Sequence, residues 1–131
     1  MKLNFLISEL IKSDIAIKYN INNMPDINAL DNMLNLIFYC LQPLRDKLNQ
    51  PIIITSGFRN SKINKLVKGK SNSQHLKGQA VDFIVRGMTI NQIIEFIRNS
   101  KIEFDQLINE YDRWVHISFN KDNNRRQILK Y

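Results

Sequence analysis

The chain of 131 residues has a single cysteine, Cys40, so it cannot form an intramolecular disulfide. Cys40 lies in an apolar helical pattern, which favours a buried small hydrophobe over a metal ligand. No apolar run is long enough to cross a membrane, and the first residues lack the apolar segment and cleavage site of a signal peptide. Repeats and low-complexity linkers are also missing. We therefore expect one domain over residues 1–131, with no membrane span and no signal peptide.

Acidic residues are outnumbered, with 12 Asp and Glu against 19 Lys and Arg, and the formal net charge is +7. Such a charge attracts polyanions, which include nucleic acid, anionic lipid and an anionic cell wall. The basic residues are scattered along the chain, and neither an aromatic-basic motif nor a recognition-helix pattern accompanies them. We therefore expect no specific nucleic-acid binding.

Histidine is scarce as well, and the only two are His75 and His116. Residues 79–85 alternate as a strand does, which places Asp82 in the middle of an otherwise apolar segment. A carboxylate buried there requires a cation or several hydrogen bonds to compensate its charge. Residues 114–119 alternate in the same way around His116. Two histidines and one aspartate, with a fourth position left open, are typical of a catalytic zinc site, so we predict one zinc ion held by His75, Asp82 and His116.

Helical and extended patterns alternate along the rest of the chain. Apolar residues between 27 and 48 recur at three- and four-residue steps, which indicates one long amphipathic helix that Pro43 distorts. The tail, residues 121–131, would pack only through Ile128 and Leu129. We expect short helices at 5–19 (with Ser8 and Ser13 as candidate N-caps), 63–67 and 89–99, a buried strand at 52–55, and further strands at 79–85, 104–110 and 114–119. This order predicts an α+β fold with a mostly antiparallel sheet flanked by helices.

The length of the loop at residues 111–113 decides which face of the last hairpin carries Glu110. A three-residue loop sets Glu110 opposite Trp114 and on the same face as His116. Glu110 and His116 are then diagonal neighbours about 7 to 8 Å apart at the backbone. A two- or four-residue loop would send Glu110 to the opposite face. The three-residue loop also leaves Asp112 in the turn, where we expect it to be solvated.

Four motifs now stand in order: Thr-Ser-Gly-Phe-Arg ending at Arg59, Ser73-x-His-x-x-Gly-x-Ala-x-Asp82, Asp-Gln-Leu-Ile-x-Glu ending at Glu110, and Trp114-x-His. Together they resemble the zinc D-Ala-D-Ala carboxypeptidase family (peptidase M15), especially its single-domain branch common in phages and prophages. Each motif alone is weak, but their order and spacing make the resemblance specific over nearly the whole chain. It implies the hedgehog/DD-peptidase-like fold.

The resemblance also implies roles for individual residues. Glu110 matches the general base of peptidase members, with Asp112 as its rival because some relatives carry an acid nearer the last histidine. Arg59 matches an arginine that contacts substrate and stabilises the transition state, which suits a permanent positive charge able to bind a carboxylate. Ser73 matches a serine that positions substrate, although it could simply cap the turn before the histidine. Trp114 replaces a histidine of the classical members, and it could contact substrate or serve only in packing.

We therefore predict a zinc metallopeptidase that cleaves peptidoglycan stem peptides, either as a D,D-carboxypeptidase or as a cross-link endopeptidase. The alternative is a zinc-bearing module of weak activity that binds cell wall or serves as a virion component. With no signal peptide, the protein would stay cytoplasmic until lysis or travel with a virion. We expect a monomer unless it is part of a virion.

Overall fold

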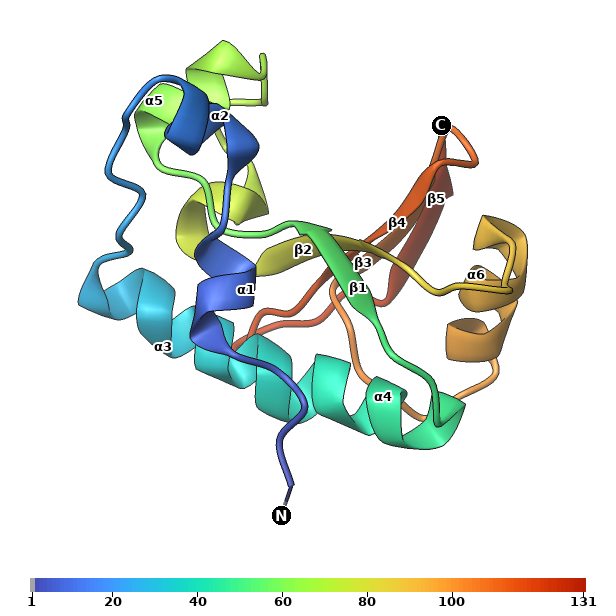
Figure 1. Cartoon of the computed structure of the whole chain (residues 1–131). Helices are drawn as coiled ribbons and strands as arrows, with labels where there is room; N and C mark the ends of the chain where they lie inside the picture. Colours follow the sequence, from blue (N-terminus) through green and yellow to red (C-terminus); the bar gives the residue numbers. More distant parts are fainter. Residues whose placement is uncertain (1) are drawn as a thin grey trace.

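The computed structural model describes residues 2–131 and is built around a five-stranded sheet in the order β1-β2-β4-β3-β5. All paired strands are antiparallel except β3 and β5, which are parallel. The strands are β1 (Ile53–Ser56), β2 (Ala80–Ile84), β3 (Gln106–Glu110), β4 (Trp114–Ser118) and β5 (Gln127–Lys130). The α+β class and the mostly antiparallel sheet are confirmed, and Figure 1 shows helices flanking the sheet.

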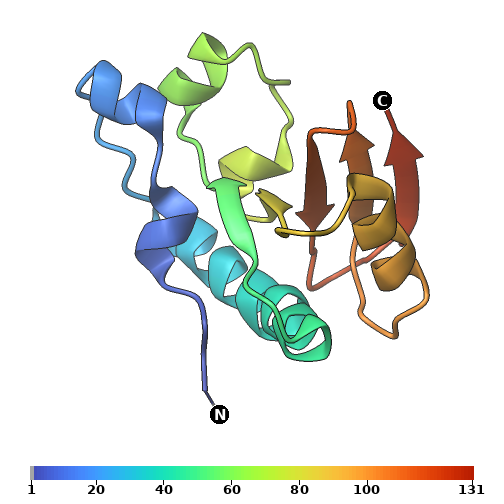
Figure 2. The same cartoon turned by 45° about the vertical axis from the view of Figure 1, so that its right-hand side comes forward.

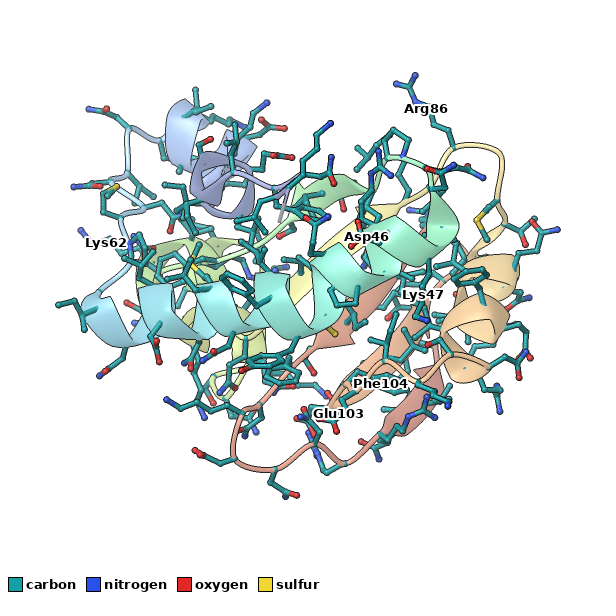
Figure 3. The ribbon with its side chains drawn as sticks, turned by 90° about the horizontal axis from the view of Figure 1, so that it is seen from below. Asp46, Lys47, Lys62, Arg86, Glu103 and Phe104 are labelled. Carbon is teal, nitrogen blue, oxygen red and sulfur yellow. The ribbon has the colours of Figure 1, made fainter. Side chains whose placement is uncertain are left out.

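The longest helical segment comprises α3 (Ile27–Leu36), the π-helical η1 (Ile37–Leu41) and α4 (Gln42–Leu48). Asp26 caps its start by accepting a hydrogen bond of 2.8 Å from the amide of Ala29. The distortion predicted at Pro43 takes the form of the π-helical segment directly before it, where the amide of Gln42 reaches the carbonyl of Ile37. Figure 3, seen from below, shows this helix lying across the sheet.

The core lies between that helix, the sheet and α6 (Ile90–Arg98), which Figure 2 shows beside the C-terminal strands. Thr89 caps α6 by a reciprocal pair of hydrogen bonds with Gln92. The remaining helical turns are α1 (Ile7–Ile11), α2 (Asp14–Lys18), α5 (Ser61–Leu66) and the 3-10 turn η2 (Gln74–Lys77). None of the helices within residues 2–131 has the length and apolarity needed to cross a bilayer.

Three expectations from the sequence need correction. The strand near 52–55 is not buried: β1 is an edge strand with an exposed Thr55, because it pairs only with β2. Ser8 lies inside α1 and does not cap it. The N-cap residue is Leu6, whose amide donates a hydrogen bond of 2.9 Å to the carboxylate of Glu9. Ser13 does cap α2, as expected. The tail does more than pack loosely, because residues 127–130 form β5 beside β3.

The side chains of strand β2 alternate between the core and the opposite face of the sheet. Val81 and Phe83 are buried in the core cluster, while Asp82 points to the other face, as the alternation predicts. Gly78 just before β2 has φ +72, and a Cβ there would collide with the carbonyl of Ala29 in α3. This close approach fixes the loop that carries His75 against the long helix.

Candidate active site

His75, Asp82 and His116 come together on the face of the sheet away from the core. Asp82 on β2 is directly paired with His116 on β4, and His75 comes from η2. Asp82 Oδ1 lies 3.1 Å from His116 Nδ1 and 3.3 Å from His75 Nε2. All three side chains are buried, and their ligand atoms lie within 4.8 Å of one another. Two imidazole nitrogens and a carboxylate oxygen in this arrangement fit a zinc ion.

The backbone holds His75 in the form that a metal requires. Its Nδ1 lies 2.8 Å from the carbonyl oxygen of Gly57, which can only accept a hydrogen bond. When a metal is bound, Nδ1–H can donate to this carbonyl while Nε2 serves as the ligand atom. Gly57 follows β1, so the strand-ending turn orients a side chain 18 residues further on.

The two histidines also determine the electrostatics of Asp82. Burial by itself would raise the pKa of Asp82, but hydrogen bonds and charge interactions with His116 and His75 outweigh burial and lower it. The carboxylate thus stays ionised at neutral pH and remains available as an anionic ligand. A divalent cation at the same point would compensate its buried charge.

Glu110 lies beside these three residues. The hairpin has the three-residue loop that places Glu110 opposite Trp114 and Ile108 opposite His116. Glu110 Oε1 is 3.5 Å from His116 Nδ1, so the carboxylate adjoins the site without belonging to the closest set of ligand atoms. Burial, and after it the charge of Asp82, raises the pKa of Glu110, while His116 opposes the shift. A metal cation would oppose it further.

Asp112, the rival acid, belongs to the turn. Its side chain accepts a hydrogen bond of 2.8 Å from Asn109 Nδ2, and its own amide donates to Asn109 Oδ1 at 2.9 Å. Its side chain is 65% exposed, compared with 21% for Glu110. Asp112 therefore stabilises a left-handed turn and points away from the two histidines.

Arg59 and Ser73 lie together on one wall of the site. The amide of Arg59 donates to the carbonyl of His75 at 3.1 Å, and Arg59 Nη2 lies 3.4 Å from Ser73 Oγ. Ser73 Oγ also accepts from the amide of His75 at 3.2 Å, so Ser73 does cap the turn. Burial lowers the pKa of Arg59, and the charges of Asp82 and Glu110 oppose that shift. Both acids are therefore close enough to act on its guanidinium.

These residues line one cavity of about 560 Å³ together with several that the motifs did not single out. Trp114 forms part of its wall beside Tyr111, with ring centroids 6.4 Å apart. The additional lining residues include Lys68, Lys70, Gln74, Gln106, Tyr131 and Arg125. Gln106 is the second residue of the Asp-Gln-Leu-Ile-x-Glu motif, whereas nothing in the sequence pattern distinguishes Arg125.

A family model described as Peptidase M15 matches residues 3–118 of the chain. The chain belongs to the peptidase M15 family. The match includes all three candidate ligands, Glu110 and Arg59, and it ends before Arg125 and β5. No curated protein matched the chain.

Membership of peptidase M15 identifies the chain as a zinc-dependent metallopeptidase. The donor set fits zinc. Two histidine nitrogens and one carboxylate oxygen take three coordination positions and leave the fourth for water or substrate. The family and the geometry therefore agree on the class of reaction, which is hydrolysis.

Proposed function

We propose that this protein hydrolyses peptide bonds in peptidoglycan stem peptides, as a D,D-carboxypeptidase or a cross-link endopeptidase, with one zinc ion held by His75, Asp82 and His116. The single observation that carries the proposal is the convergence of these side chains in a cavity that Glu110 and Arg59 also line. In this proposal the whole chain acts as one peptidase domain, released by lysis or carried by a virion.

Bound zinc would polarise the scissile carbonyl and make a water molecule acidic enough to attack near neutral pH. Glu110, placed 3.5 Å from His116, accepts the proton of the attacking water and later delivers it to the leaving amine. In this proposal Glu110 acts as the base and not as a metal ligand, because Asp82 lies closer to both histidines.

Arg59 binds the substrate and stabilises the negative charge that develops on the carbonyl oxygen. A half-buried guanidinium held by the Ser73 hydroxyl is already oriented, so little reorganisation is needed when that charge appears. Ser73 orients Arg59 and the His75 turn together, and from this position it also helps to place the substrate. Trp114 supplies an aromatic wall on the Glu110 side of the cavity, against which the substrate rests.

The test is digestion of purified peptidoglycan by the zinc-loaded protein, with mass spectrometry of the released fragments. Loss of terminal D-alanine indicates a carboxypeptidase, whereas separation of cross-linked stems indicates an endopeptidase. The matched control is His116→Ala, which should lose both the zinc, measured by elemental analysis, and the cleavage. Intact peptidoglycan after digestion by a folded, zinc-loaded protein would refute the proposal and favour a module that only binds cell wall.

A further inference from the structure

Arg125 lies in the same cavity as the candidate ligands but comes from the segment between β4 and β5, beyond the residues that match the family. Its backbone is fixed, because its amide donates to Asp105 Oδ1 at 3.0 Å and the amide of Gln127 donates to the Asp105 carbonyl at 2.9 Å. The Asp105 side chain is 3% exposed, while that of Arg125 is 51% exposed. A buried acid therefore holds an accessible arginine at the rim of the cavity.

The geometry of this ion pair leaves half of the guanidinium unused. Arg125 Nε lies 2.8 Å from Asp105 Oδ1, and Nη2 lies 3.0 Å from Oδ2, so one planar edge grips the carboxylate. A guanidinium has five N–H donors, and the second edge, formed by Nη1 and Nη2, can bind another carboxylate in the same two-pronged way. Among residues 2–131, Asp105 is the only side chain that accepts a hydrogen bond from Arg125.

Asp105 is itself held in place, which makes this edge a fixed feature of the cavity. Its Oδ2 accepts a further hydrogen bond of 2.9 Å from Gln74 Nε2, and Gln74 immediately precedes the candidate ligand His75. The orientation of Arg125 is thus coupled through Asp105 to the turn that carries the metal site. An arginine placed only to hold the tail would not need to line the cavity.

Arg59 and Arg125 line the same cavity but come from opposite edges of the sheet. Arg59 follows the edge strand β1, and Arg125 precedes the opposite edge strand β5, with the β2 and β4 ligands between them. Along β3, the cavity residue Gln106 stands two residues before Ile108, the partner of His116, a distance of roughly 7 Å. A peptide bound in this cavity can therefore meet two guanidinium groups, those of Arg59 and Arg125.

We propose that Arg125 forms a second anion subsite in the cavity, separate from Arg59, which binds a substrate carboxylate. This inference rests on the proposed function and specifies which substrate group Arg125 binds. In a stem peptide with lysine at the third position, the carboxylate that is not C-terminal belongs to the glutamyl residue and occurs either free or as its amide. Arg125 therefore makes the protein selective for stems in which this carboxylate is free.

The experiment measures binding, so that it does not depend on turnover. Two synthetic stem pentapeptides, identical except for a free or an amidated glutamyl carboxylate, are titrated calorimetrically into the zinc-loaded Glu110→Gln protein. The free acid should bind about tenfold more tightly, as expected for a charge-assisted, two-pronged contact at a half-exposed site. In the Arg125→Lys background the preference should disappear, because an ammonium held by Asp105 has no second planar edge.

The matched control is Arg126→Lys, which changes the neighbouring arginine. Arg126 donates to the Ser100 carbonyl at 2.9 Å and lies over the Phe104 ring, outside the cavity, so this variant should keep the full preference. Equal affinity for the two peptides, no measurable binding of either, or a preference that survives Arg125→Lys would overturn the inference. Cleavage by the parent protein is scored separately: binding with the preference but no cleavage would refute only the proposed function.

Discussion

Replacement of Glu110 by glutamine tests the proposed chemistry most directly. Glutamine keeps the size of the side chain and its ability to hydrogen bond, but it cannot accept a proton from the attacking water. General-base catalysis contributes about a hundredfold to ten-thousandfold, so kcat/KM should fall by at least about a hundredfold, or roughly 2.7 kcal/mol in the barrier.

The structure also predicts what this substitution leaves unchanged. Asp82 is nearer to both histidines than Glu110 is, so zinc content, measured by elemental analysis, should remain close to that of the parent. The raised pKa of Glu110 means that burial and the charge of Asp82 disfavour its ionised form in the metal-free protein. In the metal-free protein, Glu110→Gln should therefore change the free energy of unfolding by less than about 1 kcal/mol.

Asp112→Asn is the matched control, two residues away on the same hairpin. Its amide oxygen can still accept the hydrogen bond from Asn109, so the turn should persist and activity should stay within a few-fold of the parent. The assay is the initial rate of product release from a stem peptide, followed by chromatography at substrate concentrations below KM. If Asp112→Asn lost more activity than Glu110→Gln, the base would be Asp112; if neither variant lost activity, the cleavage would not come from this site.

Three further substitutions test separate parts of the argument. Arg59→Ala should lower kcat/KM by about a hundredfold or more while the thermal midpoint stays near the parent's; normal activity with a large drop in stability would show that Arg59 is only structural. Gly78→Ala should lower the free energy of unfolding, measured in urea, by at least about 1 kcal/mol, since its φ is +72 and the new Cβ meets Ala29; an unchanged midpoint would contradict the close approach. The hydrogen bond from Arg125, against the opposing effect of burial, lowers the pKa of Asp105, so this stabilisation is complete above the unfolded-state pKa of about 3.9 and is lost as pH falls through the folded-state value. Asp105→Asn should therefore be less stable than the parent at pH 7 in urea unfolding, and a difference that widened toward pH 2 would refute this reasoning.

The candidate ligands could be placed from the sequence because strand alternation is a local property. Asp82 and His116 each occupy the middle of an alternating segment, so their faces follow from parity alone, and the structure pairs them directly. The position of Glu110 followed from counting three residues in the hairpin loop, and that register is confirmed. The predicted catalytic role of Glu110 is a separate question, which the substitutions above address.

Edges of the sheet were harder to predict, because pairing between distant segments leaves little trace in a short stretch of sequence. Residues 52–55 are apolar enough for a central strand, but no second partner for β1 exists in the described sheet. Strand β5 has only four residues and pairs in parallel with β3, which lies about twenty residues earlier. The contact between Gln74 and Asp105 is equally invisible in the sequence, since it joins residues 31 apart.

Strand β5 gives the cavity a wall that the family match does not include. By pairing with β3, it keeps the chain before it against Asp105, and this contact brings Arg125 to the cavity. The proposed hydrolytic residues all lie within the matched residues 3–118, whereas Arg125 lies outside them. If Arg125 reads the glutamyl carboxylate, then the chemistry belongs to the part of the chain shared with the family, and the choice of substrate depends in part on the segment that follows it.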